Sequence, residues 1–250
     1  MADVLKLDFW LMTYPKDYPW LPYLWKSIEQ YVTGFRQCVL VLEEQDPEPT
    51  DLPSYVIVKR CRDYRGTSIP GYWGQSIEGL RSHQYTDANI IWFLESDAPF
   101  VRPINVLNDS DWPSIKPNLL YDSWEDVGAA KKWQKACEDL LDPVKAPYEM
   151  MRSHPFIYSR DIVQTCWEQI SKNSDIFDYV ENIHTEISQF NILNNWMFHL
   201  NSLQDGRLCN PIHAQQNRDK IPAKCTRQFW SHHGADHPDI LAELKSIGLA

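Results

Sequence analysis

The sequence contains no long hydrophobic run. Its longest uninterrupted apolar stretches, Ile90–Leu94 and Cys38–Leu42, are five residues each, far short of the roughly 20 that a helix needs to cross a bilayer. Asp3, Lys6 and Asp8 interrupt the segment where a signal peptide would carry its apolar core. The sequence therefore predicts a cytoplasmic protein without a membrane span.

Closely spaced cysteine pairs are also missing. The chain has six cysteines, and no two of them form a CxxC pair, which argues against a zinc knuckle. Without an export signal, widely separated cysteines are expected to remain reduced thiols. They are Cys38, Cys61, Cys137, Cys166, Cys209 and Cys225.

No repeat, low-complexity tract or linker divides the 250 residues. A hydrophobic content of 43% and a charged content of 23% are ordinary for a globular protein and exclude disorder, collagen and coiled coil. A chain of this length buries roughly 70–75% of the surface of its unfolded form, so it needs no disulfide or structural metal to fold. We therefore expect a single domain over residues 1–250.

Acidic side chains outnumber basic ones except near the C-terminus. The formal net charge is −10, which disfavours nonspecific attraction to DNA or to an acidic membrane surface. Residues 207–250, in contrast, hold six basic and four acidic side chains. This segment is either a solvated loop or an anion site.

The first hundred residues alternate between short apolar strands and amphipathic helices. This β-α-β-β-α-β order predicts an α/β domain with a mostly parallel central sheet flanked by helices. Ligands in such sheets bind at the carboxyl ends of the strands. The expected strands are Leu5–Thr13, Arg36–Leu42, Tyr55–Lys59 and Asn89–Leu94, and the expected helices are Leu21–Tyr31 and Gln75–Tyr85.

The second half begins with a proline-flanked, charged stretch. Residues Asn105–Pro147 are expected to form an insertion that faces the substrate. Periodicity and turn residues predict further elements after it. We expect helices at Trp124–Leu141, Arg160–Ser171, Ser188–Leu203 and Asp239–Ile247, and a strand at Phe156–Tyr158.

An acidic triplet, Glu95-Ser96-Asp97, directly follows the buried strand Asn89–Leu94. Two carboxylates separated by one residue can both turn toward a cation at the edge of the sheet. Mg²⁺ and Mn²⁺ prefer oxygen ligands and often bind through one or two carboxylates plus substrate phosphates. The alternative interpretation of the triplet is a solvated turn.

Several motifs, in order and spacing, resemble nucleotide-sugar glycosyltransferases of the GT-A type, and more narrowly a DUF6492-like group. The resemblance covers about residues 5–235 apart from the middle insertion. It implies a GT-A, Rossmann-like domain that transfers a sugar from a nucleoside diphosphate sugar, with UDP favoured, in the presence of Mn²⁺ or Mg²⁺. The motifs are Phe9–Ser27, Gly71–Gln75, Tyr85–Ala88, Trp92–Asp97, Met150–Pro155, Ser188–Asn191 and Phe229–Gly234.

The resemblance assigns residues 1–104 to the donor and residues 105–250 to the acceptor. Gln75 is favoured over Arg81 as a donor contact, because six residues separate them and they do not share a helix face. Asp17 has an alternative role as a helix cap. The candidate donor-binding residues are Thr13, Tyr14, Asp17, Gln75, Arg81 and Lys224, and the candidate metal ligands are Glu95, Asp97 and either His232 or His233.

The chain departs from the family pattern at two positions. The acidic motif begins with Glu95 where such enzymes usually have Asp, so Asp97 is the safer ligand. Gln189 stands where the related pattern has an acid, and an amide cannot take a proton at neutral pH. Glu186 is the nearest acid and the candidate general base of an inverting transferase, whereas a retaining mechanism would not need a base in that position, so the stereochemistry stays open. The candidate catalytic residues are Glu186, Gln189, Asn191 and Asp97, and Arg152, His154 and Trp196 are expected near the sugar or acceptor.

The acceptor is left open between two kinds of hydroxyl. One belongs to a glycan intermediate, and the other belongs to a hydroxymethylated base in phage DNA. The protein is accordingly expected in a bacterial cell or in a phage-infected host cell. Two other function classes compete with a transferase. A metal-dependent nucleotidyltransferase or phosphohydrolase would use the same carboxylates, and a noncatalytic carbohydrate-binding protein would bind sugar without metal or nucleotide.

Overall fold

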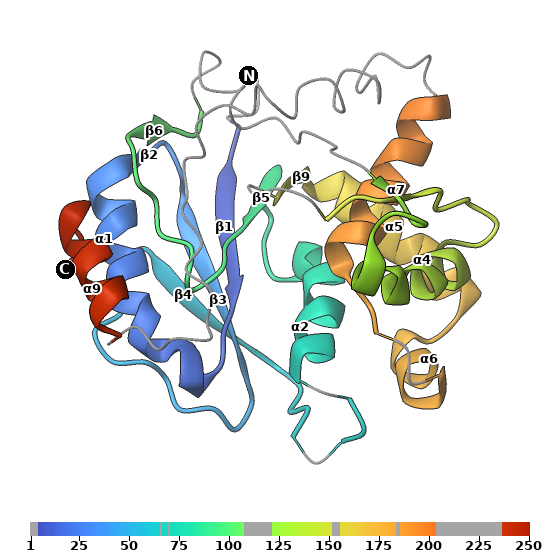
Figure 1. Ribbon diagram of the computed structural model, residues 1–250, viewed down its shortest axis with the longest axis horizontal. Coiled ribbons are helices and arrows are strands. Elements are labelled where there is room, and N and C mark those ends of the chain that lie inside the picture. Colours follow the sequence, from blue (N-terminus) through green and yellow to red (C-terminus); the bar gives the residue numbers. More distant parts are fainter. Residues whose placement is uncertain are drawn as a thin grey trace.

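A mostly parallel five-stranded sheet lies at the centre of the protein (Figure 1). Its strands are β1 (Leu7–Met12), β3 (Gln37–Glu43), β4 (Val56–Cys61), β5 (Ile90–Phe93) and β9 (Phe156–Ser159). The spatial order is β4-β3-β1-β5-β9, and only β9 runs antiparallel to its neighbour. This computed structural model describes residues 5–65, 67–69, 71–107, 122–151, 156–183, 186–203 and 237–250.

Helices cover both faces of the sheet, as the sequence predicted for an α/β domain (Figure 1). None of those in the described part is long and apolar enough to span a membrane. The α-helices are α1 (Leu21–Tyr31), α2 (Gly71–Leu80), α4 (Gln134–Leu141), α5 (Arg160–Asn173), α6 (Ile176–Ile183), α7 (Gln189–Leu203) and α9 (Pro238–Ser246), and the 3-10 helices are η1 (Pro15–Trp20), η2 (Ser82–Gln84) and η3 (Gly128–Trp133).

Two pairs of very short strands accompany the main sheet. The strand β2 (Val32–Thr33) pairs in parallel with β6 (Ile104–Asn105). The strand β7 (Asp122–Ser123) pairs antiparallel with β8 (Tyr148–Glu149). Sequence periodicity did not predict these pairs, because two residues are too few to show an alternation.

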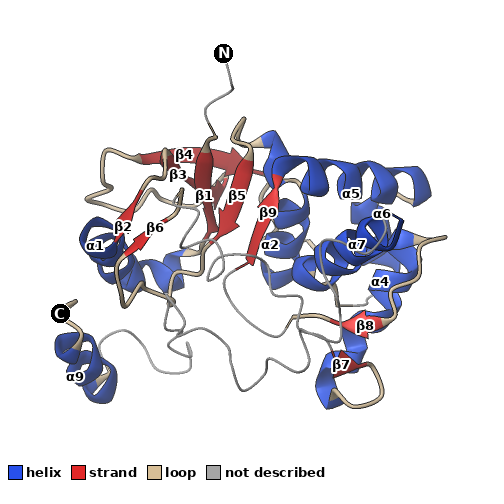
Figure 2. Ribbon diagram, turned by 90° about the horizontal axis from the view of Figure 1, so that it is seen from above, coloured by secondary structure: helices blue, strands red, loops and turns tan. Residues whose placement is uncertain are grey.

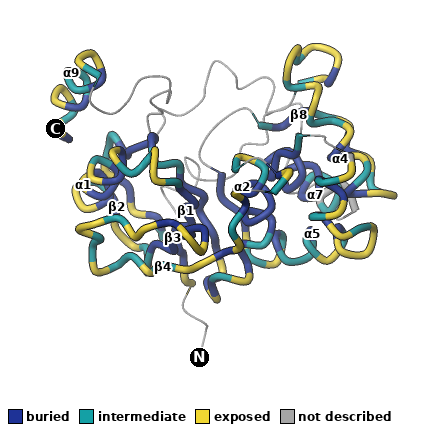
Figure 3. The backbone as a smooth tube through the Cα atoms, turned by 90° about the horizontal axis from the view of Figure 1, so that it is seen from below, coloured by how far each residue is buried: buried dark blue, intermediate teal, exposed yellow. Residues whose placement is uncertain are grey.

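Alternation along β1 divides the core between the two faces of the sheet. Leu7, Phe9 and Leu11 pack with the apolar side of α1, whereas Trp10 and Met12 pack with the side formed by α2, α4, α5 and α7. Successive side chains of a strand point to opposite faces, so a strand covered on both sides is apolar throughout. The strands β1, β3, β5 and β9 are accordingly buried along most of their length. The edge strand β4 has three exposed residues, and the helices also carry exposed residues (Figure 3).

The helix α9 packs against α1, at the side of the molecule away from α7 (Figure 2). Ile240 and Leu244 form a small apolar cluster with Trp20, the last residue of η1. The Tyr31 hydroxyl donates a hydrogen bond of 3.0 Å to the Ile247 carbonyl oxygen. The predicted closing helix is thus confirmed, and it supports the segment between β1 and α1.

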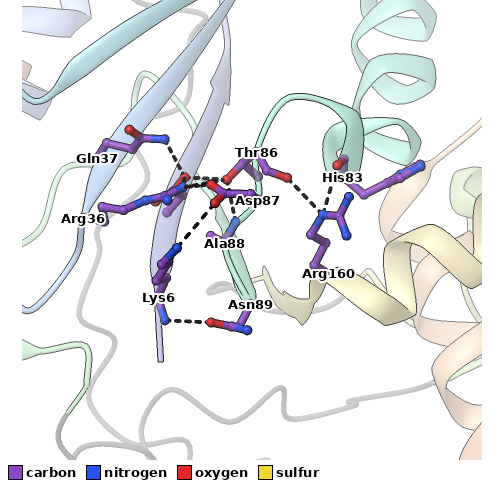
Figure 4. A network of polar contacts seen from close by, with 10 residues as sticks. Lys6, Arg36, Gln37, His83, Thr86, Asp87, Ala88, Asn89 and Arg160 are labelled. Carbon is purple, nitrogen blue, oxygen red and sulfur yellow. Dashed lines mark hydrogen bonds and ion pairs between the residues drawn. The ribbon is translucent and has the colours of Figure 1, made fainter. Parts of the chain in front are cut away.

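A buried carboxylate links the amino ends of the central strands (Figure 4). Asp8 is completely buried, and its two oxygens accept hydrogen bonds from Arg36 Nε and Nη2 at 2.8 and 2.6 Å. Gln37 and Thr86 donate to the same carboxylate. The network therefore ties β1 to the start of β3 and to the segment before β5.

Two predicted helices have different bounds in the structure. The helix expected at Gln75–Tyr85 begins four residues earlier, and at Arg81 its backbone bonding tightens into the 3-10 turn of η2. The stretch Trp124–Leu141 is not one helix. Gly128, the first residue of η3, has a positive φ of 55°, so the chain turns there, and α4 begins only at Gln134.

Four cysteines lie in the described part of the chain as free thiols. All four are buried in the core, which agrees with the prediction of reduced cysteines for this part. Cys209 and Cys225 lie outside the described residues. The buried thiols are Cys38, Cys61, Cys137 and Cys166.

Candidate functional site

The strands β1 and β5 bring two predicted motifs to one edge of the sheet. They pair in parallel with Trp10 opposite Phe93, and the Leu94 N–H donates to the Trp10 carbonyl oxygen at 2.9 Å. The next residues of both segments therefore emerge side by side. One segment continues to Tyr14, and the other continues to the acidic triplet Glu95-Ser96-Asp97.

A cavity of about 240 Å³ opens at this edge. Its lining comes from three places in the sequence: the segment after β1, the first turns of α2 and the triplet after β5. Five of the predicted donor and metal residues meet there. The lining residues are Met12, Tyr14, Lys16, Asp17, Tyr72, Gln75, Glu95, Ser96 and Asp97.

Tyr14 joins the segment after β1 to the start of α2. Its hydroxyl donates a hydrogen bond to the Gly71 carbonyl oxygen, and its ring lies within van der Waals distance of the position that a Cβ on Gly71 would take. Burial, followed by the charge of Glu43, raises the pKa of this hydroxyl well above its usual range. Tyr14 therefore remains a protonated donor that holds α2 against the cavity.

Asp17 and Lys16 contribute opposite charges on η1. Burial raises the pKa of the Asp17 carboxyl, and the charge of Lys16 offsets part of that rise. The residue that precedes α1 is Trp20, which makes no side-chain capping bond. Asp17 therefore does not cap the first α-helix, and it lines the cavity.

Gln75 and Tyr72 lie three residues apart on one face of α2 and both line the cavity. The Gln75 Nε2 atom lies 3.4 Å from the Met12 carbonyl oxygen, to which it donates. Tyr72 is 42% exposed. Burial of its hydroxyl, and then the charges of Glu186 and Glu95, raise the pKa of Tyr72 to about 12.

Sequence reasoning missed Tyr72 as a site residue because the helix was expected to begin at Gln75. With the helix starting at Gly71, the spacing of three residues would have placed Tyr72 beside Gln75. Lys16 was missed as well, although it stands next to Asp17. Neither residue type is diagnostic of a ligand site by itself.

The carboxylates of Glu95 and Asp97 are suited to a hard divalent cation, because both line the same cavity and Mg²⁺ or Mn²⁺ binds through one or two carboxylates plus substrate phosphates. Asp97 is 9% exposed. Within the described ranges, no group of three or more His, Cys, Asp or Glu side chains could hold a metal. The third predicted ligand, His232 or His233, lies outside those ranges.

Glu186, the candidate base, is held by a residue of the insertion. Its Oε2 atom lies 2.6 Å from the Lys132 ammonium nitrogen. Its charge also acts on Tyr72 at the cavity. Glu186 itself is not among the residues that line the cavity.

Gln189 and Asn191 make structural contacts inside the protein. The Gln189 Oε1 atom accepts a hydrogen bond of 2.7 Å from the Ser76 hydroxyl, which joins α7 to α2. Asn191 is completely buried, and its Oδ1 atom accepts from the Met150 backbone N–H at 2.6 Å. The structure does not bring either side chain to the lining of the cavity.

Three other predicted residues also lie apart from the cavity lining. Arg81 pairs with the buried Glu78 at 2.9 Å. Trp196 is 8% exposed and donates from its indole nitrogen to the Thr165 hydroxyl at 3.0 Å. Thr13 is buried between two lining residues. Arg152, His154 and Lys224 lie outside the described residues.

Comparison with known proteins supports the fold of this site. No protein-family model matches the chain, and no curated protein matches it significantly in sequence. A crystal structure of the galactosyltransferase LgtC in complex with donor and acceptor sugar analogues superposes with a TM-score of 0.55 and 11% identity, over 96% of this chain and 94% of that one. An active-site mutant of LgtC gives a TM-score of 0.54 and 12% identity, with the same coverage. The protein therefore has the GT-A fold of LgtC.

Proposed function

We propose that the protein is a metal-dependent glycosyltransferase that moves a sugar from a nucleoside diphosphate sugar to an acceptor hydroxyl. The observation that carries this proposal is the cavity at the carboxyl ends of β1 and β5, where Tyr14, Asp17 and Gln75 meet Glu95 and Asp97. Ligands of open α/β sheets bind at this edge. The GT-A fold shared with LgtC supports the same class of reaction.

The residues of the cavity divide into two groups. Asp17 supplies a carboxylate that accepts hydrogen bonds, and Gln75 supplies an amide; both groups suit the hydroxyls and the base of a nucleoside. Lys16 supplies a positive charge for phosphate. Glu95 and Asp97 would hold Mn²⁺ or Mg²⁺, which when bound would neutralise the charge that develops on the diphosphate leaving group. We assign residues 1–104 to the donor and residues 105–250 to the acceptor.

The proposal extends to finer points of chemistry. We infer that the donor is a UDP-sugar carrying a hexose or pentose, and that a hydroxyl of a glycan accepts the sugar. We assign the role of general base to Glu186, because Gln189 cannot take a proton; the effect of the Glu186 charge on the pKa of Tyr72, which lines the cavity, supports this assignment. A hydroxymethylated DNA base is the second acceptor to test.

Calorimetric binding of UDP and GDP, in Mn²⁺ and in EDTA, tests the donor site. We expect UDP to bind in Mn²⁺ and to lose about tenfold or more of its affinity in EDTA or in the Asp97→Asn variant. Glu138→Gln is the matched control, because Glu138 is an exposed acid of α4 that is not among the lining residues. It should bind as the unmodified protein does.

The binding experiment and an assay of the reaction products together separate the competing functions. If UDP or GDP binds equally well in Mn²⁺ and in EDTA, or if neither nucleotide binds, the triplet Glu95-Ser96-Asp97 is a structural turn. Either result would favour a carbohydrate-binding protein. Release of free phosphate or pyrophosphate without sugar transfer would favour a nucleotidyltransferase or phosphohydrolase.

A further inference from the structure

An ion pair connects the middle insertion to the loop that precedes α7. The Lys132 ammonium nitrogen lies 2.6 Å from the Glu186 Oε2 atom. Lys132 belongs to η3, whereas Glu186 stands 54 positions later in the sequence. The pair therefore exists only because the insertion packs beside the start of α7.

Within the described residues, one oxygen of the Glu186 carboxylate is engaged. Across the described ranges, Lys132 Nζ is the only ion-pair or hydrogen-bond partner of Glu186, and it contacts Oε2. The Glu186 side chain is 34% exposed, so solvent or a substrate can reach it. The charge of this carboxylate acts on Tyr72, which lines the cavity together with Glu95.

We propose that Lys132 is a positioning residue that fixes Oε2 of Glu186 and so presents Oε1 to the acceptor hydroxyl. This inference rests on the proposed glycosyltransferase function. A general base has to lie within hydrogen-bond reach of the proton that it takes, and a carboxylate pinned at one oxygen has fewer orientations to sample. Lys132 acts through Glu186 and need not touch the substrate.

The step assigned to Glu186 is a proton transfer that accompanies sugar transfer. The acceptor oxygen forms a bond to the anomeric carbon, and the bond from that carbon to the diphosphate oxygen breaks. The electron pair of the broken bond leaves on the diphosphate. The hydroxyl proton passes to Oε1 of Glu186, so that charge and atoms balance.

The neighbouring lysine provides a matched control. Lys131 lies on the same 3-10 helix, and its ammonium nitrogen lies 2.8 Å from Glu125 Oε2. Both lysines are about half exposed, at 51% for Lys131 and 48% for Lys132. Exposed ion pairs contribute little to folding stability, so Lys131→Met and Lys132→Met should both fold. Only Lys132→Met removes the contact to Glu186.

The test measures release of UDP from UDP-galactose and UDP-glucose in Mn²⁺, with water as the acceptor, and the Kd of UDP by calorimetry. We expect Lys132→Met to lower kcat about tenfold with KM and the Kd unchanged, and Glu186→Gln to lower it about a hundredfold. Lys132→Arg should keep kcat within about threefold, since it retains the charge. Adding Lys132→Met to Glu186→Gln should cause no further loss.

Each contrary result has a distinct meaning. The inference is wrong if the kcat of Lys132→Met equals that of Lys131→Met. It is also wrong if Lys132→Met lowers kcat by the same factor with and without Glu186→Gln, or if Lys132→Met changes only KM and the Kd. Tight binding of UDP without any release from either donor would also overturn it, because water can reach the exposed carboxylate. A protein that binds no nucleotide at all would instead overturn the proposed function, and this inference with it.

Discussion

Replacing Gly74 by alanine should weaken the fold at the helix that carries two cavity residues. A Cβ at this position would lie 2.6 Å from Cδ2 and 2.7 Å from Cγ of Tyr64, closer than nonbonded carbon atoms approach. The Tyr64 ring cannot move aside easily. It is buried, and its hydroxyl donates to the buried Glu78 carboxylate at 2.7 Å.

Two opposing effects set the magnitude. Forcing an extra carbon into a well-packed core costs about 1–3 kcal/mol, whereas exchanging glycine for alanine within a helix stabilises by about 0.5–1 kcal/mol. The net expectation for Gly74→Ala is a loss of up to about 2.5 kcal/mol. In a protein of this size, each kcal/mol corresponds to about 2–4 °C in Tm.

Gly71→Ala, on the same helix, is the matched control. Its added Cβ would lie 3.4 Å from the nearest atom, Cζ of Tyr14, which is an ordinary contact. Urea unfolding and thermal unfolding of both variants measure the difference. Because α2 carries Tyr72 and Gln75, Gly74→Ala should also weaken UDP binding. A Gly74→Ala protein as stable as Gly71→Ala would refute the view that Tyr64 fixes this helix.

Two further predictions concern buried carboxylates. Burial, and then the Asp63 carboxylate, raise the pKa of Glu43 from 4.5 to about 7. The folded protein therefore binds this proton more tightly than the unfolded chain does, and ionisation of Glu43 destabilises the fold as the pH rises from 4.5 to 7. Relative to the unmodified protein, Glu43→Gln should therefore gain stability between pH 5 and pH 8, by at most about 3 kcal/mol. Urea unfolding at both pH values measures this gain, with the exposed Glu44→Gln variant as the control. A gain for Glu43→Gln no larger than that for Glu44→Gln would contradict the prediction. Arg36→Met should lower the free energy of unfolding by about 3–5 kcal/mol, because it leaves the buried Asp8 carboxylate without its cation; a loss below about 1 kcal/mol would argue against that role.

The elements of the first hundred residues were predictable because their signals are local. The runs Phe9–Met12, Cys38–Leu42 and Ile90–Phe93 are apolar, as expected of strands covered on both faces. Parallel pairing then places their carboxyl ends at one edge, so the position of Glu95 and Asp97 beside Tyr14 followed from the order of elements.

Local signals were less informative for the insertion and for α7. Helical periodicity from Trp124 to Leu141 concealed the turn at Gly128, where the backbone adopts a positive φ. Gln189 and Asn191 stand where the resemblance implies catalysis, yet both side chains make buried contacts to Ser76 and Met150. Sequence position alone does not say toward which neighbour a side chain of α7 turns.

The sequence by itself determined the α/β class, the strands that end at the cavity and the pair of carboxylates suited to a divalent cation. Only the tertiary structure decided that Tyr72 joins Gln75 at the cavity and that Lys132 pairs with Glu186. The physical reason is that strand formation and the ends of parallel strands depend on neighbouring residues, whereas contacts between distant segments depend on how helices pack on the sheet.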